Sequence, residues 1–230
     1  MALYVDSAYL HSIIEVAQAL PLAGVTMNPS IMLAAREQGQ KLEPSSLLRE
    51  LLATFDGTVF IQPGAISEQE MLQEALNYIQ ADPQRVIPKI PMTQNGLKVA
   101  MQLKHQGQRL AFTAVTSIAQ TYCAAQAGAD FVIPYFNRLE RSGINASERV
   151  AQMVKVLALQ HVYHTNMPTM PETRLLVASL KTPTEVACAL QAGAHDLTLP
   201  PNVLLEMVRD PLSEQAVDKF VQDWQKMKKL

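Results

Sequence analysis

The chain alternates between short apolar runs and longer amphipathic segments from end to end. The apolar runs are rich in Val, Ile, Leu and Phe and carry few charges, which is typical of parallel strands buried on both faces. We predict such strands at 3–6, 25–27, 58–62, 86–91, 109–113, 131–135, 174–179 and 196–199.

Apolar residues three and four positions apart follow almost every run and predict helices. In the first of these segments the spacing connects Leu10, Ile13 and Ala17. Ser67 and Glu70 have the spacing of a capping box, which marks the start of a helix. We predict helices at 9–20, 31–36, 45–54, 67–81, 93–106, 117–127, 146–163, 183–191, 201–209 and 213–228.

The order of these elements predicts the fold. Repeated strand–helix units with apolar strands form parallel sheets with right-handed crossovers. Eight such units in 230 residues fit a (β/α)8 TIM barrel in a single domain, 1–230, with an extra terminal helix within 213–230. An open doubly wound sheet is the alternative, but that fold carries Gly-x-Gly-x-x-Gly after its first strand, where this chain has Asp6-Ser7-Ala8.

Composition narrows the classes of function. The chain is 48% hydrophobic and 17% charged with a net charge of −2, which argues against nucleic-acid binding or attraction to an anionic membrane. No apolar run reaches transmembrane length and the N-terminus does not resemble a signal peptide, so we expect a cytoplasmic protein. We expect Cys123 and Cys188 to be buried free thiols. His161 and His164 share a helix without a third ligand, so we expect no metal site and no cofactor.

Lys89 is the residue that this pattern does not explain. It stands between apolar residues in the strand 86–91. An ammonium is costly to bury unless it is paired or loses its proton, and desolvation lowers the pKa of an amine. A neutral amine is a nucleophile toward carbonyl carbons, so Lys89 is a candidate catalytic residue.

Polar residues end the other predicted strands or follow them directly. In a (β/α)8 barrel this end carries the active site. Each residue also has an ordinary interpretation: Asp6 and Asn28 as helix caps, Tyr135 as a core aromatic with a satisfied hydroxyl, Arg138 as the partner of Glu140. The strand-end residues are Asp6, Asn28, Gln62, Lys89, Thr113, Tyr135, Asn137, Arg138 and Ser179.

Several blocks of the sequence resemble the transaldolase family, in the order in which that family has them. The run 21–31, Pro-Leu-Ala-Gly-Val-Thr-Met-Asn-Pro-Ser-Ile, is similar to the family signature, and 86–93 with Gly96-Leu97 is similar to its Schiff-base lysine motif. The short chain, with Leu3-Tyr4-Val5-Asp6 at its start, resembles the small bacterial subfamily of fructose-6-phosphate aldolases and short transaldolases. The remaining matching blocks are 113–115, 134–138, 178–183 and 197–200.

The resemblance implies roles for particular residues. Lys89 would form the Schiff base, with Asp6 and Asn28 beside it to hold substrate hydroxyls and the amine. Tyr135 would be the acid/base and act through a water held by Gln62 and Thr113. The resemblance also implies that Thr26, with Asn28, binds substrate and that Arg138 and Ser179 hold a phosphate.

Two of these positions separate activities within the subfamily. Its aldolases have Gln and Tyr where its transaldolases usually have Glu and Phe, and this chain has Gln62 and Tyr135. The resemblance therefore implies a metal-independent class I aldolase that cleaves fructose 6-phosphate to dihydroxyacetone and glyceraldehyde 3-phosphate. The alternatives are a transaldolase that uses the same lysine to transfer a dihydroxyacetone unit, and a non-catalytic sugar-phosphate-binding barrel.

The chain departs from the family pattern at several positions. Pro88 precedes the lysine, and Met27 stands where Thr is common. The segment 139–145 lacks a Gly-Gly pair, and the chain ends without the Phe-Gly-Arg tail of relatives. Family members assemble as decamers in which the terminal helix packs on a neighbour, so the resemblance implies a homodecamer.

Overall fold

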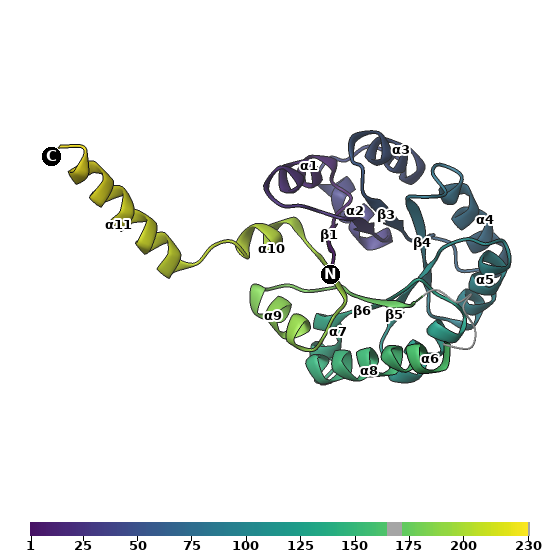
Figure 1. The fold of residues 1–230 in the computed structure, drawn as a ribbon. Helices are drawn as coiled ribbons and strands as arrows, with labels where there is room; N and C mark the ends of the chain where they lie inside the picture. The colour runs from purple at the N-terminus through teal and green to yellow at the C-terminus, as the bar shows by residue number, and fades with distance from the viewer. Residues whose placement is uncertain (165–171, 230) are drawn as a thin grey trace.

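The computed structural model describes residues 1–164 and 172–229, with the backbone alone at 160–164. Its strands form one closed parallel barrel in sequence order (Figure 1). The first strand pairs with both the second and the eighth. The (β/α)8 prediction is therefore confirmed, and the open sheet is excluded. The strands are β1 (Leu3–Asp6), β2 (Gly24–Met27), β3 (Thr58–Ile61), β4 (Val86–Pro91), β5 (Ala111–Val115), β6 (Phe131–Pro134), β7 (Arg174–Val177) and β8 (Asp196–Leu199).

Helices cover the outside of the barrel (Figure 1). Most lie where the spacing predicted them, and the six-residue α7 was not predicted because the sequence favoured a loop there. The helices are α1 (Leu10–Ala19), α2 (Pro29–Glu37), α3 (Pro44–Thr54), α4 (Glu68–Ile79), α5 (Gln94–His105), α6 (Ile118–Gln126), α7 (Phe136–Arg141), α8 (Ala146–His164), α9 (Pro183–Gln191), α10 (Pro201–Glu206) and α11 (Pro211–Met227).

The predicted capping box at the start of α4 forms only in part. Ser67 Oγ accepts from the backbone N–H of Glu70, as expected, but the Glu70 carboxylate bonds to the Ser67 hydroxyl instead of the cap backbone. A complete capping box is found at the start of α6, between Ser117 and Gln120.

The side chains of each strand alternate between two apolar layers, because successive residues of a strand point to opposite faces. One layer lies between the barrel and the helices and includes Val5, Val25 and Ile90. The other fills the barrel interior. Its members are Tyr4, Phe60, Ile87, Ala111, Phe131, Ile133, Tyr135, Leu176 and Ala178.

Three aromatic rings fill the barrel interior on the N-terminal side of Lys89. The Phe60 ring makes edge-to-face contacts with Tyr4 and Phe131, at centroid distances of 5.3 and 5.0 Å. Such pairs stabilise a core beyond the area they bury. Because Phe60 and Phe131 are buried and Tyr4 is only 6% exposed, this end of the barrel is packed.

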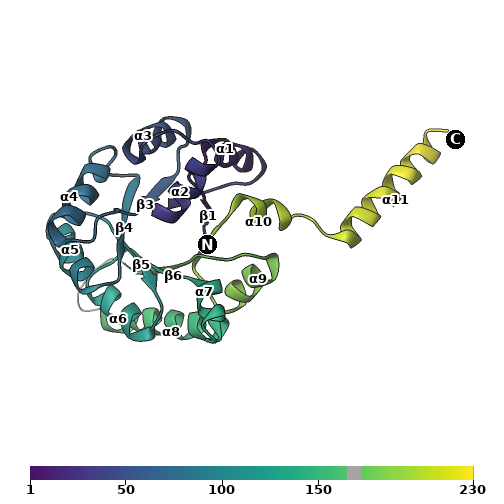
Figure 2. The ribbon, with the colours of Figure 1, turned by 180° about the vertical axis from the view of Figure 1, so that it is seen from behind.

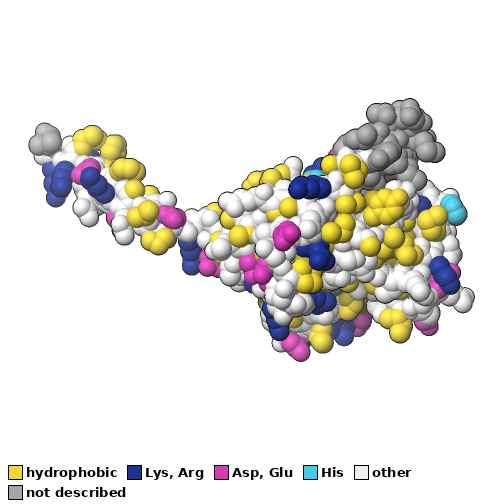
Figure 3. All heavy atoms as spheres, turned by 90° about the horizontal axis from the view of Figure 1, so that it is seen from below, with side chains coloured by type: hydrophobic (Ala, Val, Ile, Leu, Met, Phe, Trp, Pro, Cys, Tyr) yellow, Lys and Arg dark blue, Asp and Glu magenta, His cyan; other side chains and the backbone are white. Residues whose placement is uncertain are grey.

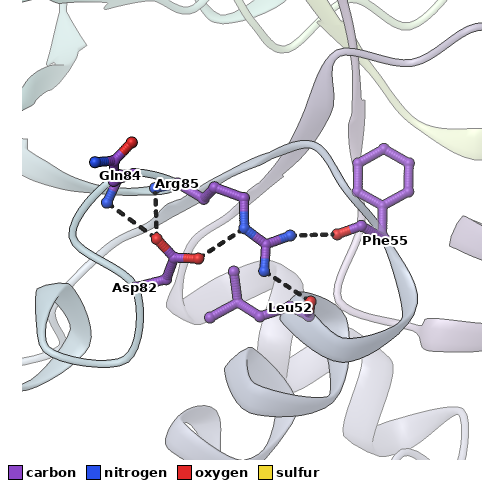
Figure 4. Close-up of polar contacts among 5 residues, drawn as sticks. All are labelled: Leu52, Phe55, Asp82, Gln84 and Arg85. Carbon is purple, nitrogen blue, oxygen red and sulfur yellow. Dashed lines mark hydrogen bonds and ion pairs between the residues drawn. The ribbon is translucent and has the colours of Figure 1, made fainter.

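Arg85 fixes the start of the strand that carries Lys89 (Figure 4). Its guanidinium donates to Asp82 Oδ2 at 2.7 Å and to the carbonyls of Phe55 and Leu52 at 2.9 and 2.8 Å. These carbonyls lie at the C-terminal end of α3, where helix carbonyls lack intrahelical partners. The Arg85 hydrogen bond holds the pKa of the Asp82 carboxyl below its usual range.

The prediction of free cysteines was confirmed, and the prediction that they are buried was wrong. Both cysteines are free thiols, but Cys123 is exposed and Cys188 is only partly buried. Cys188 packs against the edge of the hydrophobic core, whereas Cys123 lies on the exposed surface of α6. The side chains of His161 and His164 lie outside the described residues.

The last helix, α11, lies apart from the barrel (Figures 1 and 2). Every residue of α11 is exposed, and hydrophobic side chains are visible along it in Figure 3. They include Val217, Phe220 and Trp224, at 56, 67 and 55% exposure. Within the described part of the chain, no helix is long and apolar enough to cross a bilayer.

Candidate active site

The position of Lys89 follows from strand alternation. Ile87 points into the barrel interior, so Lys89, two residues further along β4, points the same way. Its side chain is only 1% exposed. The strand then ends, and α5 starts close by: a Cβ at Gly96 would lie 1.9 Å from the carbonyl oxygen of Pro91. Glycine at 96 therefore permits this sharp return after the lysine strand.

Lys89 contributes to a cavity of about 440 Å³ at the C-terminal end of the strands. This volume is within the range of small-molecule sites. Most of the residues predicted from the strand ends line it together, namely Asp6, Asn28, Gln62, Lys89, Tyr135, Arg138 and Ser179. Thr26 and Thr113 are fully buried and lie behind the lining residues.

The surroundings of Lys89 favour the neutral amine. Burial lowers the pKa of Lys89, and the nearby charge of Asp6 opposes this lowering in part. A neutral amine at the base of a cavity can attack a carbonyl carbon, which an ammonium cannot do.

Asp6 is held from behind by Thr26, which in turn contacts Thr198. Thr26 Oγ1 donates to Asp6 Oδ1 at 2.6 Å and lies 2.6 Å from the hydroxyl of Thr198. The alternative interpretation of Asp6 as a helix cap is wrong, because Tyr9 is the N-cap of α1 and no side chain caps this helix start. Thr26 is fully buried and donates to the carboxylate that lines the cavity, and its predicted role in substrate binding stays a prediction.

Tyr135 lies across the cavity with its hydroxyl 2.7 Å from Thr113 Oγ1. Burial raises the pKa of Tyr135, the Thr113 hydrogen bond lowers it, and the charges of Asp6 and Arg138 act in opposite directions. The phenol therefore keeps its proton at neutral pH and can act as an acid.

Asn28 both caps a helix and lines the cavity. Its Oδ1 accepts from the backbone N–H of Ile31 at 3.0 Å, which makes it the N-cap of α2. The amide nitrogen remains as a donor for a ligand.

Arg138 and Ser179 lie together at the opening of the cavity. The Arg138 guanidinium stacks over the Tyr135 ring at 4.9 Å. It does not pair with Glu140, whose carboxylate accepts from the N–H of Ala146. Ser179 adopts φ = +61°, and its carbonyl accepts from the N–H of Asn137. Arginine and a hydroxyl suit a phosphate group.

The chain was compared with known proteins. It matches the family described as Transaldolase/Fructose-6-phosphate aldolase over residues 3–230. The chain belongs to this transaldolase family. Its members include a probable transaldolase of Alkaliphilus metalliredigens, 34% identical over 98% of both chains. A probable transaldolase of Symbiobacterium thermophilum is 33% identical over 99% of both.

A solved structure supports the fold alone. The inosine 5' monophosphate dehydrogenase of Legionella pneumophila superposes with a TM-score of 0.60 at 11% identity. The match covers 89% of this chain and 59% of the dehydrogenase.

Two departures from the transaldolase pattern, Met27 and Pro88, do not change the wall of the cavity at Lys89 directly. Met27 packs in the layer between barrel and helices. Pro88 lies between the inward-facing Ile87 and Lys89, so its ring faces the helices. Neither residue lines the cavity.

Sequence reasoning missed Lys181, which also lines the cavity. It lies in the block 178–183 that carries the transaldolase resemblance, so the signal was present. It was overlooked because it follows the β7 strand end by several residues instead of standing at it.

Proposed function

We propose that the protein is a class I aldolase that reversibly cleaves fructose 6-phosphate to dihydroxyacetone and glyceraldehyde 3-phosphate. The observation that carries the proposal is Lys89, an amine of lowered pKa at the base of a polar cavity in a chain of the transaldolase family.

The proposed reaction starts with attack of the Lys89 amine on the sugar ketone. Loss of water gives an iminium, which withdraws electrons from the neighbouring C3–C4 bond. A base removes the proton of the C4 hydroxyl, the bond breaks, and its electron pair forms an enamine while the aldehyde departs. Protonation of the enamine carbon and addition of water then release dihydroxyacetone and the free amine.

The surrounding side chains suit these steps. Asp6, fixed by Thr26, faces Lys89 and can hold the amine and a sugar hydroxyl. Tyr135 can exchange protons with the reacting carbons through a water bound near Gln62 and Thr113. Asn28 would hold a hydroxyl, and Arg138 with Ser179 would bind the phosphate at the cavity opening.

Tyr135 favours aldolase over transaldolase chemistry. An aldolase must protonate the enamine in order to release dihydroxyacetone, whereas a transaldolase must preserve the enamine until an aldehyde arrives. A protonated phenol beside Gln62, a neutral amide, supports protonation. The second candidate, transaldolase, is favoured by the names of the two relatives, both probable transaldolases.

The Schiff base is tested by reductive trapping. Incubation with dihydroxyacetone and borohydride should add the mass of dihydroxyacetone less one oxygen atom to the peptide that contains Lys89, because the imine loses water and its reduction adds two hydrogens; mass spectrometry measures the gain. Lys89→Met should abolish the adduct and cleavage, whereas the control Lys98→Met, on the exposed face of α5, should retain both. An unmodified Lys89 peptide in the wild type would contradict the mechanism.

The choice between the two reactions is tested with the donor alone. Wild type should cleave fructose 6-phosphate steadily without an added acceptor, and Tyr135→Phe should lose about tenfold or more of this activity, since a general acid commonly contributes 10²–10⁴-fold. Transfer from fructose 6-phosphate to an added aldehyde should fall much less. If wild type releases glyceraldehyde 3-phosphate steadily only when an acceptor is present, and frees no dihydroxyacetone, the protein is a transaldolase.

We also propose that the protein is a homo-oligomer, a decamer in keeping with the family resemblance, in which α11 packs on a second copy. The support is the exposed apolar face of α11, which includes Val217, Phe220 and Trp224. These residues are three or four positions apart and so lie on one side of the helix. Exposed apolar faces of this kind commonly mark interfaces.

A further inference from the structure

A second cavity lies beside the opening of the cavity at Lys89. Its volume is about 500 Å³. It shares Arg138, Ser179 and Lys181 with the cavity at Lys89, so the two adjoin. All of its lining side chains are polar: Asn137, Arg138, Arg141, Ser142, Ser179 and Lys181.

The charged side chains that line this second cavity are all positive. Arg138 and Arg141 lie three residues apart on α7, and Lys181 approaches from the segment between β7 and α9. In the described ranges, no ion pair involves any of the three. Like charges one turn apart on a helix repel each other, so the arrangement is unfavourable until an anion binds.

The neighbouring carboxylates are engaged elsewhere. Glu140, on α7, accepts from the backbone N–H of Ala146. Glu185, on α9, accepts from Asn137 Nδ2 at 2.7 Å and from the backbone N–H of Lys181 at 2.6 Å. These contacts order the cavity wall and leave the cationic ends of Arg141 and Lys181 facing solvent.

One phosphate does not account for this cavity. The proposed function places a single phosphate at Arg138 and Ser179, and the cavity at Lys89 already has the volume for a sugar monophosphate. Arg141 lies beyond that position, lining only the second cavity. A fork of guanidinium donors next to a lysine is suited to a further phosphoryl group.

We propose that Arg141, with Lys181, forms a second anion subsite, so that the protein binds ligands with two neighbouring phosphoryl groups more tightly than ligands with one. The inference extends the proposed function, on which it rests for the placement of the sugar carbonyl at Lys89. One phosphoryl group lies at Arg138 and Ser179, and the other lies at Arg141 and Lys181.

The test uses isothermal titration calorimetry of the full-length protein with inorganic phosphate and pyrophosphate. Wild type should bind pyrophosphate about tenfold more tightly than phosphate, the effect of one additional charge-assisted contact. Arg141→Gln should remove this preference and change phosphate affinity by less than about twofold. Arg141→Lys, which keeps the charge but not the fork, should retain part of the preference.

The control is Arg49→Gln, which removes the same charge from α3, where the Arg49 guanidinium donates to Ser46 Oγ. It should bind both ions as wild type does. Equal affinity of wild type for the two ions, or equal weakening of both by Arg141→Gln, overturns the subsite. Fructose 6-phosphate should displace pyrophosphate, and a failure to do so also overturns it.

Calorimetry separates this inference from the proposed function because it needs no turnover. If Lys89 cannot be trapped but the pyrophosphate preference depends on Arg141, the mechanism fails and the subsite stands. If Lys89 is trapped and the preference is absent, the subsite alone fails.

Discussion

At the scale of single residues, Lys89 connects the stability of the fold to its chemistry. A group whose pKa falls on folding binds fewer protons in the folded chain than in the unfolded chain. For Lys89, the folded and unfolded chains differ in bound protons between the pH of its lowered pKa and pH 10.5, its ordinary pKa. Lys89 therefore lowers the free energy of unfolding at neutral pH. This destabilisation disappears as pH rises toward 10.5.

Lys89→Met is expected to stabilise the fold at neutral pH. Its free energy of unfolding should exceed that of wild type by up to about 1.4 kcal/mol for each pH unit between the working pH and 10.5. The difference should shrink steadily between neutral pH and pH 10.5, as measured by urea denaturation of both proteins.

The control Ile87→Met changes the preceding inward residue without touching a charge, so its effect should not vary with pH. A Lys89→Met gain that stays constant or grows with pH would contradict the lowered pKa.

The sequence identified the cavity residues well because strand ends of a barrel meet on one face. Asp6, Lys89 and Tyr135 needed only their position on a strand to be found. The hydrogen bonds of Thr26 to Asp6 and of Thr113 to Tyr135 were not predicted from the sequence. Such contacts depend on register between strands, which a single sequence does not show.

At the scale of elements, β5 contains the irregularity that matters most for the site. Its pairing with β6 shifts register between Thr113 and Val115, and Ala114 between them has φ = +59°. The left-handed conformation costs a non-glycine residue about 1–2 kcal/mol. This local strain accompanies the contact of Thr113 with Tyr135.

Ala114→Gly is therefore expected to raise the free energy of unfolding by about 0.5–1 kcal/mol, the relief of strain less the entropy of a more flexible unfolded chain. Chemical denaturation measures the change. The matched control, Ala111→Gly, lies in the same strand with φ outside the left-handed region and should destabilise by about 0.5–1 kcal/mol. A loss of stability in Ala114→Gly would show that the backbone there is not strained.

Elements differed in how well the sequence predicted them, for local reasons. β4 and β8 were predicted to the residue because prolines or polar turns bound them. β5 starts later than expected because the N–H of Leu110 donates to the Asp130 carboxylate instead of a strand. α7 was missed because one and a half turns contain too few positions for a helical period, although this helix carries Arg138 and Arg141.

At the scale of the whole molecule, the barrel and α11 differ in whether they bury their own apolar side chains. The barrel buries its own core, whereas α11 leaves its apolar face in solvent (Figures 2 and 3). No residue of α11 is buried, so the barrel does not depend on it. The proposed oligomer supplies the missing partner.

We expect the double variant Phe220→Asp/Trp224→Asp to dissociate the oligomer to a species near the chain mass of 25.4 kDa, as measured by light scattering after size-exclusion chromatography. Charges on this face oppose its burial against a second copy. Circular dichroism should show a folded barrel. The control Gln215→Asp/Gln222→Asp adds the same charge on the opposite side of α11 and should leave the mass unchanged. A monomeric wild type would contradict the assembly.

The rings of Tyr4, Phe60 and Phe131 determine how substrates and products reach and leave Lys89. They make the barrel a tube with one open end, so every molecule that reaches Lys89 enters and leaves by the same route. In the proposed reaction, the sugar would lie there with its carbonyl next to Lys89 and its phosphate at the opening, so the fragments would leave in order of depth. The aldehyde fragment would leave first, and the dihydroxyacetone fragment would follow. Another aldehyde that enters before the proposed enamine is protonated can react with it, so the same tube is suited to building new sugars from added aldehydes.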